Sequence, residues 1–176
     1  DEVDLRTLEF TSSADVVALS KDGRRIAVGT RDGIVNIVPS ASWAVEVMLG
    51  VASEVTTTKE KIMSLAFSNN GKKVVCGLET DSFVVYDVET SAILNSFEHE
   101  GSAGVACCFF ANNSDMLVAG GSAPGAYTVH ATKPFQPLCT LSMASNDVAP
   151  PSLSNAAVST RNSIALASGS RLQVFE

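Results

Sequence analysis

The sequence is poor in charged and aromatic residues, and its basic residues are outnumbered by its acidic ones. Charged residues make up 18% and aromatic residues 6%, and 12 Lys and Arg against 19 Asp and Glu give a formal net charge of −7. Proteins that bind nucleic acid neutralise phosphates with clustered Lys and Arg. The sequence has no such cluster, so we expect neither direct nucleic acid binding nor attraction to an anionic lipid surface.

Long apolar runs and helical periodicity are also missing. The longest apolar run, residues 105–111, is far shorter than the roughly 20 residues that span a bilayer, so no membrane insertion is expected. No segment repeats apolar residues with a period of 3.6, which predicts almost no helix. Hydrophobic residues still make up 45% of the chain, which is enough to build a folded core.

Residues suited to catalysis or metal binding are scarce. Neither of the two histidines, His99 and His130, lies beside a nucleophile turn. Among the predicted innermost strands only one starts with an acid, Asp15, whereas a metal site needs several converging ligands. We therefore expect no enzyme activity, no cofactor, no metal and no small-molecule ligand.

The four cysteines form no C-x-x-C pair: they are Cys76, Cys107, Cys108 and Cys139. Each lies in an apolar run that resembles a strand, and no histidine stands at the spacing of a zinc ligand. We expect buried, reduced thiols, which favours a cytoplasmic or nuclear protein.

What the sequence does contain is an internal repeat with a period between forty and fifty residues. A polar turn, Ser20-Lys21-Asp22-Gly23-Arg24, has a near copy in Ser68-Asn69-Asn70-Gly71-Lys72 and weaker copies that begin at Ala111 and Ser159. Short runs rich in Val, Ile, Phe and Ala flank each turn, which is typical of strands. Three of the four units contain four such runs.

Four short strands in each repeat predict an all-β chain whose units are four-stranded antiparallel blades of a β-propeller. About four blades are expected, over residues 14–50, 61–98, 104–142 and 155–176. Residues 5–10 form a further strand-like run and are the candidate for a closing strand.

The repeating pattern resembles the WD-repeat family. Tyr86-Asp87 stands where that family has Trp-Asp, Asp32 lies in the tight turn where the family usually has an Asp, and His99 stands near the position of its Gly-His pair. No unit has Trp-Asp itself. The resemblance implies a ring closed by a blade that mixes N-terminal and C-terminal strands. The chain is then either part of a larger ring or a small or open propeller completed by a partner.

The resemblance further implies a scaffold that binds other protein subunits in a multiprotein complex. The candidate contact residues are Asp32, Trp43, Thr57, His99 and Tyr127. Two other hypotheses stay open. One is a propeller enzyme or ligand-binding propeller of a non-WD family, which acids or a metal in the central channel would favour. The other is the regulatory propeller of a longer chain.

Overall fold

The computed structural model describes strands and the turns that join them, with no helix among the described residues. These residues are 6–45, 47–50, 60–80, 82–98, 107–110, 116–120, 126–132, 135–142, 153–158, 164–168 and 171–175. In this part of the chain there is consequently no helix long and apolar enough to cross a membrane. The predicted all-β class is confirmed.

The strands form four separate sheets, each built from strands that follow one another in the sequence. The first sheet contains β1 (Ala14–Leu19), β2 (Arg25–Thr30), β3 (Ile34–Pro39) and β4 (Val47–Gly50). The second contains β5 (Ile62–Phe67), β6 (Lys73–Leu78), β7 (Ser82–Asp87) and β8 (Ile93–Glu98). The third contains β9 (Cys107–Phe110), β10 (Met116–Gly120), β11 (Ala126–Thr132) and β12 (Phe135–Ser142). The last contains β13 (Leu153–Val158), β14 (Ile164–Ser168) and β15 (Arg171–Phe175).

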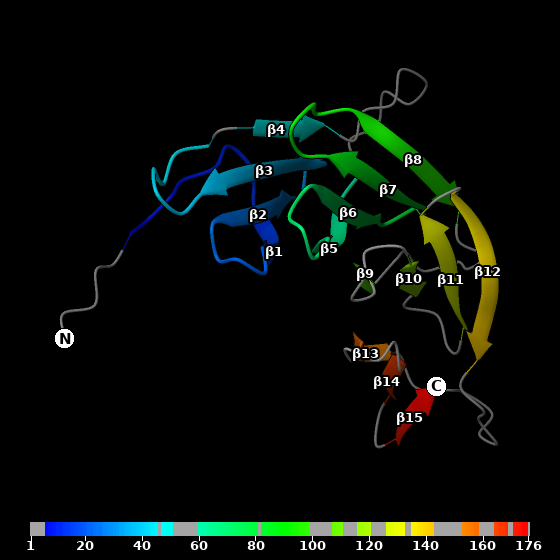
Figure 1. Ribbon diagram of the computed structural model, residues 1–176. Helices are drawn as coiled ribbons and strands as arrows, with labels where there is room; N and C mark the ends of the chain where they lie inside the picture. Colours follow the sequence, from blue (N-terminus) through cyan, green and yellow to red (C-terminus); the bar gives the residue numbers. More distant parts are fainter. Residues whose placement is uncertain are drawn as a thin grey trace.

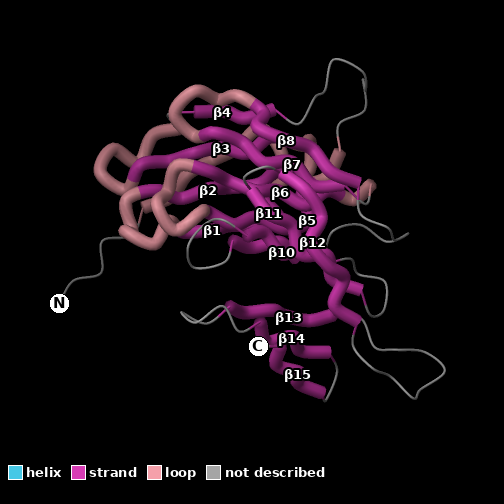
Figure 2. Tube along the Cα trace, turned by 45° about the vertical axis from the view of Figure 1, so that its right-hand side comes forward, coloured by secondary structure: helices cyan, strands magenta, loops and turns pink. Residues whose placement is uncertain are grey.

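All neighbouring strands are antiparallel, which confirms the predicted antiparallel sheets. The first strands of successive sheets contact one another in series, β1 with β5, β5 with β9 and β9 with β13. Figures 1 and 2 show the result, an arc of sheets whose two ends lie apart. The described elements do not close into a ring.

Residues 5–10 behave differently from the expected closing strand. The structure describes residues 6–10 and they form no strand, while the last sheet has three strands in the described part of the chain. A strand needs an adjacent edge to pair with, and β15 lies at the other end of the arc (Figure 1). Glu9 and Phe10 instead lie near β3 and β4 of the first sheet, which directly follows them in the sequence.

The larger core lies between the first and second sheets. Its fully or nearly fully buried members come from both: Ala27, Val35, Ile37, Leu49, Ile62, Val74, Cys76, Leu78, Val84, Tyr86 and Val88. Two polar contacts also join these sheets. The Tyr86 hydroxyl donates to the Gly50 carbonyl at 2.9 Å, and the Arg25 guanidinium donates to the Gly71 carbonyl at 3.1 Å. Burial is therefore combined with contacts that set the relative position of the two sheets.

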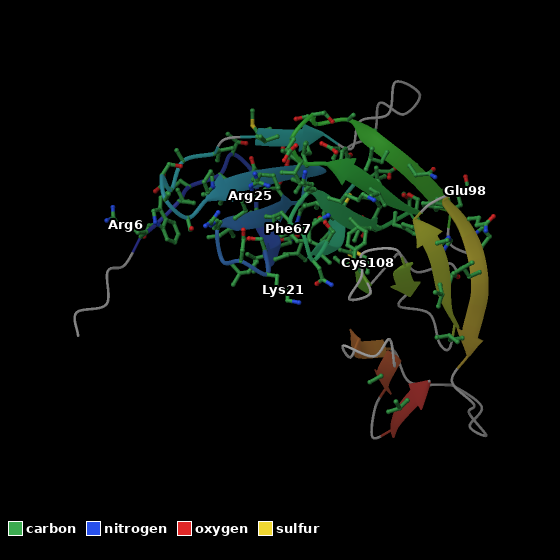
Figure 3. The ribbon with its side chains drawn as sticks, in the orientation of Figure 1. Arg6, Lys21, Arg25, Phe67, Glu98 and Cys108 are labelled. Carbon is green, nitrogen blue, oxygen red and sulfur yellow. The ribbon has the colours of Figure 1, made fainter. Side chains whose placement is uncertain are left out.

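A second core joins the second sheet to the third. Phe83 stacks on Phe97 with ring centroids 4.8 Å apart, and the His130 ring lies 4.9 Å from Phe83 and 4.8 Å from Phe97. Cys108 belongs to the same core and lies on β9 beneath the second sheet (Figure 3). Its sulfur is 3.3 Å from the Ser64 hydroxyl. The third sheet is thus held to the second mainly by aromatic packing.

Truncating the central ring of this second core should strongly destabilise the protein. We expect Phe83→Ala to lower the free energy of unfolding by about 3–5 kcal/mol, because a fully buried ring is replaced by a cavity. Ile93→Ala, at an exposed position of the same sheet, is the control and should change stability by less than about 0.5 kcal/mol. Urea unfolding at pH 7 measures both. A loss below about 1 kcal/mol for Phe83→Ala would contradict this packing.

Candidate protein-docking surfaces

The repeated polar turns have the same hydrogen bonds in the first two sheets. In the β1–β2 turn the Ser20 hydroxyl donates to Asp22 Oδ1 at 2.7 Å and accepts from the Arg25 N–H at 2.9 Å. In the β5–β6 turn the Ser68 hydroxyl donates to Asn70 Oδ1 at 2.8 Å and accepts from the Lys73 N–H at 2.9 Å. Side chains that satisfy the backbone in this way make a rigid turn.

These two turns lie side by side and line a shallow cleft of about 180 Å³. Arg25 crosses from one turn to the other through its bond to Gly71. Arg24 and Lys72 line the cleft as well, but so do the carboxylates of Asp22 and Glu89, and Lys72 Nζ lies 4.0 Å from Glu89 Oε1. Charges of both signs are therefore interspersed, and the cleft has no concentrated field that would select an anion.

The sheet ends opposite these turns carry a cluster of charges around Asp15. Its carboxylate accepts from the Ser13 hydroxyl at 2.9 Å and from Arg31 Nε at 3.2 Å, and Lys61 Nζ lies 3.6 Å away. These contacts, with the Ser13 bond as the largest, lower the pKa of Asp15 below its ordinary value. The acid that was the best sequence candidate for an axial site is thus part of an ion pair between the first two sheets.

The candidate contact residues lie at separate places. Asp32 precedes β3 and accepts from the Thr30 hydroxyl at 2.6 Å, whereas Trp43 follows the same strand. A six-residue strand lies between them, so they are about 20 Å apart along the sheet. Tyr127 lies in β11, where it pairs with Gly120 and Leu141. Thr57 and His99 lie outside the described residues.

Trp43 stands out among these candidates because it is 38% exposed and has a left-handed backbone, with φ of 52°. Its N–H donates to the Pro39 carbonyl at 3.0 Å, which closes the turn after β3. Two residues later Val45 is also exposed. A large apolar ring on a hydrogen-bonded turn loses little freedom when a partner covers it.

An apolar depression of about 250 Å³ lies on the first sheet, and it includes Thr30 and Ile34, which flank the Asp32 turn. Its lining comes from the N-terminal segment, β2, β3 and the β4 region: Glu9, Phe10, Thr11, Thr30, Ile34, Asn36, Val45 and Met48. Met48 is 68% exposed. Its alternation with Val47 and Leu49, which face the second sheet, places it on the opposite side of β4. Phe10, Val45 and Met48 are not among the sequence candidates, because Met48 lies in the apolar run Val47-Met48-Leu49 and only the packing shows that it faces away from the core.

Among the described residues we looked for metal ligands and nucleophilic side chains. They contain no group of three His, Cys, Asp or Glu that could hold a metal ion. The cysteines whose side chains are described, Cys76 and Cys108, are buried and form no disulfide. Burial raises the pKa values of the Cys76 thiol and the Tyr86 hydroxyl, with a smaller contribution from a neighbouring sulfur in each case. Both groups are therefore poor nucleophiles at neutral pH.

Two glycines with positive φ should differ in their response to alanine. Gly71 has φ of 69° with open space around an added Cβ, whereas at Gly33, with φ of 79°, the Cβ would lie 2.8 Å from the Glu60 carbonyl oxygen. We expect Gly71→Ala to cost about 1–2 kcal/mol and Gly33→Ala more. Gly50→Ala, which meets neither strain nor a neighbour, is the control. Urea unfolding checks the order, and equal losses at positions 33 and 71 would contradict it.

Acid stability should depend on Asp22. The Ser20 hydroxyl and the Arg24 N–H lower the pKa of Asp22 below its ordinary value of 3.8. A carboxylate with a lowered folded pKa stabilises the protein above 3.8, and this stabilisation is lost as the pH falls through the folded pKa. Asp22→Asn reproduces the residue found at Asn70, so it should match the wild type at pH 7 and lose less stability between pH 5 and 2. Thermal unfolding across this range tests it, and parallel profiles would count against it.

Comparisons with known proteins do not assign a function to these surfaces. No model of a protein family matches the chain, and no curated protein matches it significantly.

Proposed function

We propose that this chain is a WD-type β-propeller region that serves as a scaffold for binding other proteins. Support comes from the series of sequential antiparallel sheets, in which each first strand contacts the next. The pair at the end of β7 supports it as well. Tyr86 fills the core, and Asp87 accepts from the N–H groups of Glu89 and Thr90 at 3.0 and 2.8 Å. An arc of sheets joined by exposed turns can bind partners without a catalytic group.

The observation that carries this proposal is the set of apolar residues that the first sheet and its turns leave uncovered, which we call the end surface: Trp43 in the turn after β3, and Val45, Met48 and Phe10 at the depression. Trp43, Val45 and Met48 are exposed, and Phe10, Val45 and Met48 line the depression. Exposed apolar side chains that gather beside a concave site are typical of protein contact surfaces. Tryptophan is enriched among the few residues that dominate binding energy. We therefore propose the end surface as the contact site, with Trp43 as its anchor.

Replacing the anchor should reduce partner binding without unfolding the chain. We expect Trp43→Ala and Met48→Ala each to weaken partner capture by at least about tenfold, which corresponds to about 1.4 kcal/mol. The measurement is crosslinked affinity purification of the tagged full chain from cells, with mass spectrometry of the proteins recovered.

Ile93→Ala is the matched control, because Ile93 is also an exposed apolar residue but lies on the second sheet. It should recover the same partners as the wild type. Equal recovery by all variants, with unchanged circular dichroism, would refute the end surface as the contact site. Recovery of no partner at all by the wild type would refute the scaffold function itself.

A further inference from the structure

The β5–β6 turn contains the only asparagine of the chain that is followed by glycine, Asn70-Gly71. In such a pair the backbone nitrogen of the glycine can attack the side-chain carbonyl carbon of the asparagine, because glycine has no side chain to block the approach. The Gly71 N–H gives up its proton, a bond forms between that nitrogen and Asn70 Cγ, and the Cγ–Nδ2 bond breaks to release ammonia. Water then opens the resulting succinimide ring, which leaves either aspartate or isoaspartate.

The closed turn places both reacting groups in hydrogen bonds that oppose this attack. The Gly71 N–H donates to the Ser68 carbonyl at 2.8 Å, although its nitrogen must lose that proton to react. Asn70 Oδ1 accepts from the Ser68 hydroxyl at 2.8 Å and from the Lys72 N–H at 3.0 Å, so the side chain is fixed in one orientation. The reaction therefore requires that the turn first opens.

The first sheet helps to keep this turn closed. Arg25, at the start of β2 (Figure 3), donates to the Gly71 carbonyl at 3.1 Å, and Gly71 is buried. Because this bond is made to the closed turn, it lowers the fraction of molecules in which the turn is open. Asn70 itself is exposed, so water reaches its side chain once the turn has opened. A residue of one repeat thus protects an asparagine of the next.

The fold already contains the aspartate product at the equivalent place one repeat earlier. Asp22 is followed by Gly23, which has the same φ of 69° as the glycine of the β5–β6 turn. Asp22 Oδ1 accepts from the Ser20 hydroxyl at 2.7 Å and from the Arg24 N–H at 3.1 Å, the same pattern as in the later turn. An aspartate at position 70 therefore keeps the hydrogen bonds of the turn. Isoaspartate does not, because it adds a methylene group to the backbone.

We propose that Asn70 is a site of spontaneous deamidation, and that the reaction proceeds from an open form of the β5–β6 turn. Conversion to aspartate adds a negative charge to the cleft between the two turns, which Arg25 and Lys72 also line. Conversion to isoaspartate disrupts the turn that Arg25 binds and weakens this contact between the first two sheets. The inference concerns a chemical modification of the chain and does not depend on the partner binding proposed above.

Peptide mapping by mass spectrometry tests the proposal on the full chain, incubated at pH 8 either in native buffer or in guanidinium chloride. Asn70 should deamidate in both samples, and at least about tenfold faster in the unfolded chain, because unfolding removes the hydrogen bonds that oppose the attack. Asn95 is followed by Ser96, whose side chain hinders the attack, so it is the internal control and should remain asparagine. An unmodified Asn70 in both samples, or equal rates in the two, overturns the proposal.

Substitutions on two different sheets show whether the folded turn controls the reaction. Ser68→Ala removes the hydroxyl bonds within the turn, and Arg25→Met keeps a long side chain but removes the donor to Gly71. Each should raise the native rate at Asn70 by at least about threefold and leave the rate in guanidinium chloride unchanged.

Two further variants use the internal repeat. Asp22→Asn should create a second deamidation site, because it places asparagine before Gly23 in a turn with the same hydrogen bonds. Asn70→Asp should match the wild type in urea unfolding at pH 7. Circular dichroism checks that every variant is folded. A native rate at Asn70 that neither Ser68→Ala nor Arg25→Met raises overturns the control by the turn, even if Asn70 deamidates.

Discussion

The structure depends on apolar packing between the faces of successive sheets. A sheet of three or four short strands is barely stable alone, because half of its side chains need a second surface to cover them. Here β2, β3, β6 and β7 carry apolar residues on both sides, so each sheet needs a neighbour on each face. The cores formed around Ile37 and Phe83 meet this need for the second sheet. On the other side of the first sheet Val28 and Val38 are buried, whereas Val17, Leu19 and Met48 are exposed.

Polar groups set the positions of the sheets that apolar packing brings together. Tyr86 and Arg25 each donate a hydrogen bond across the junction of the first two sheets. At the other end of that junction the Asp15 carboxylate forms ion pairs with Lys61 and Arg31. The free energy of apolar burial changes little when one sheet shifts slightly along another, because it is not directional. A hydrogen bond weakens when its donor and acceptor move out of line. Arg25, Asp15, Arg31 and Lys61 therefore all take part in contacts at the junction of the first two sheets.

Several features of the fold were predictable because they depend on local chemistry. The Ser20 and Ser68 turns repeat at equivalent positions, and their side chains satisfy the backbone within the turn itself, so each can be recognised without knowing its neighbours. The alternation of short apolar runs with such turns is enough to predict antiparallel sheets. The partnership of Phe83, Phe97 and His130 was not predictable, because His130 belongs to a different repeat and gives no local signal.

The sequence by itself determined the turns, the short strands, their antiparallel order within each repeat and the acidic balance of the chain, since all of these follow from near neighbours and composition. Tertiary structure alone decided which apolar residues are covered and which remain on the surface. Val17 and Leu65 are both apolar residues of a first strand, yet only Leu65 has a sheet packed against it. Exposure of Trp43 and Met48 likewise depends on elements distant in the sequence, because burial is a property of the neighbours a residue meets in space.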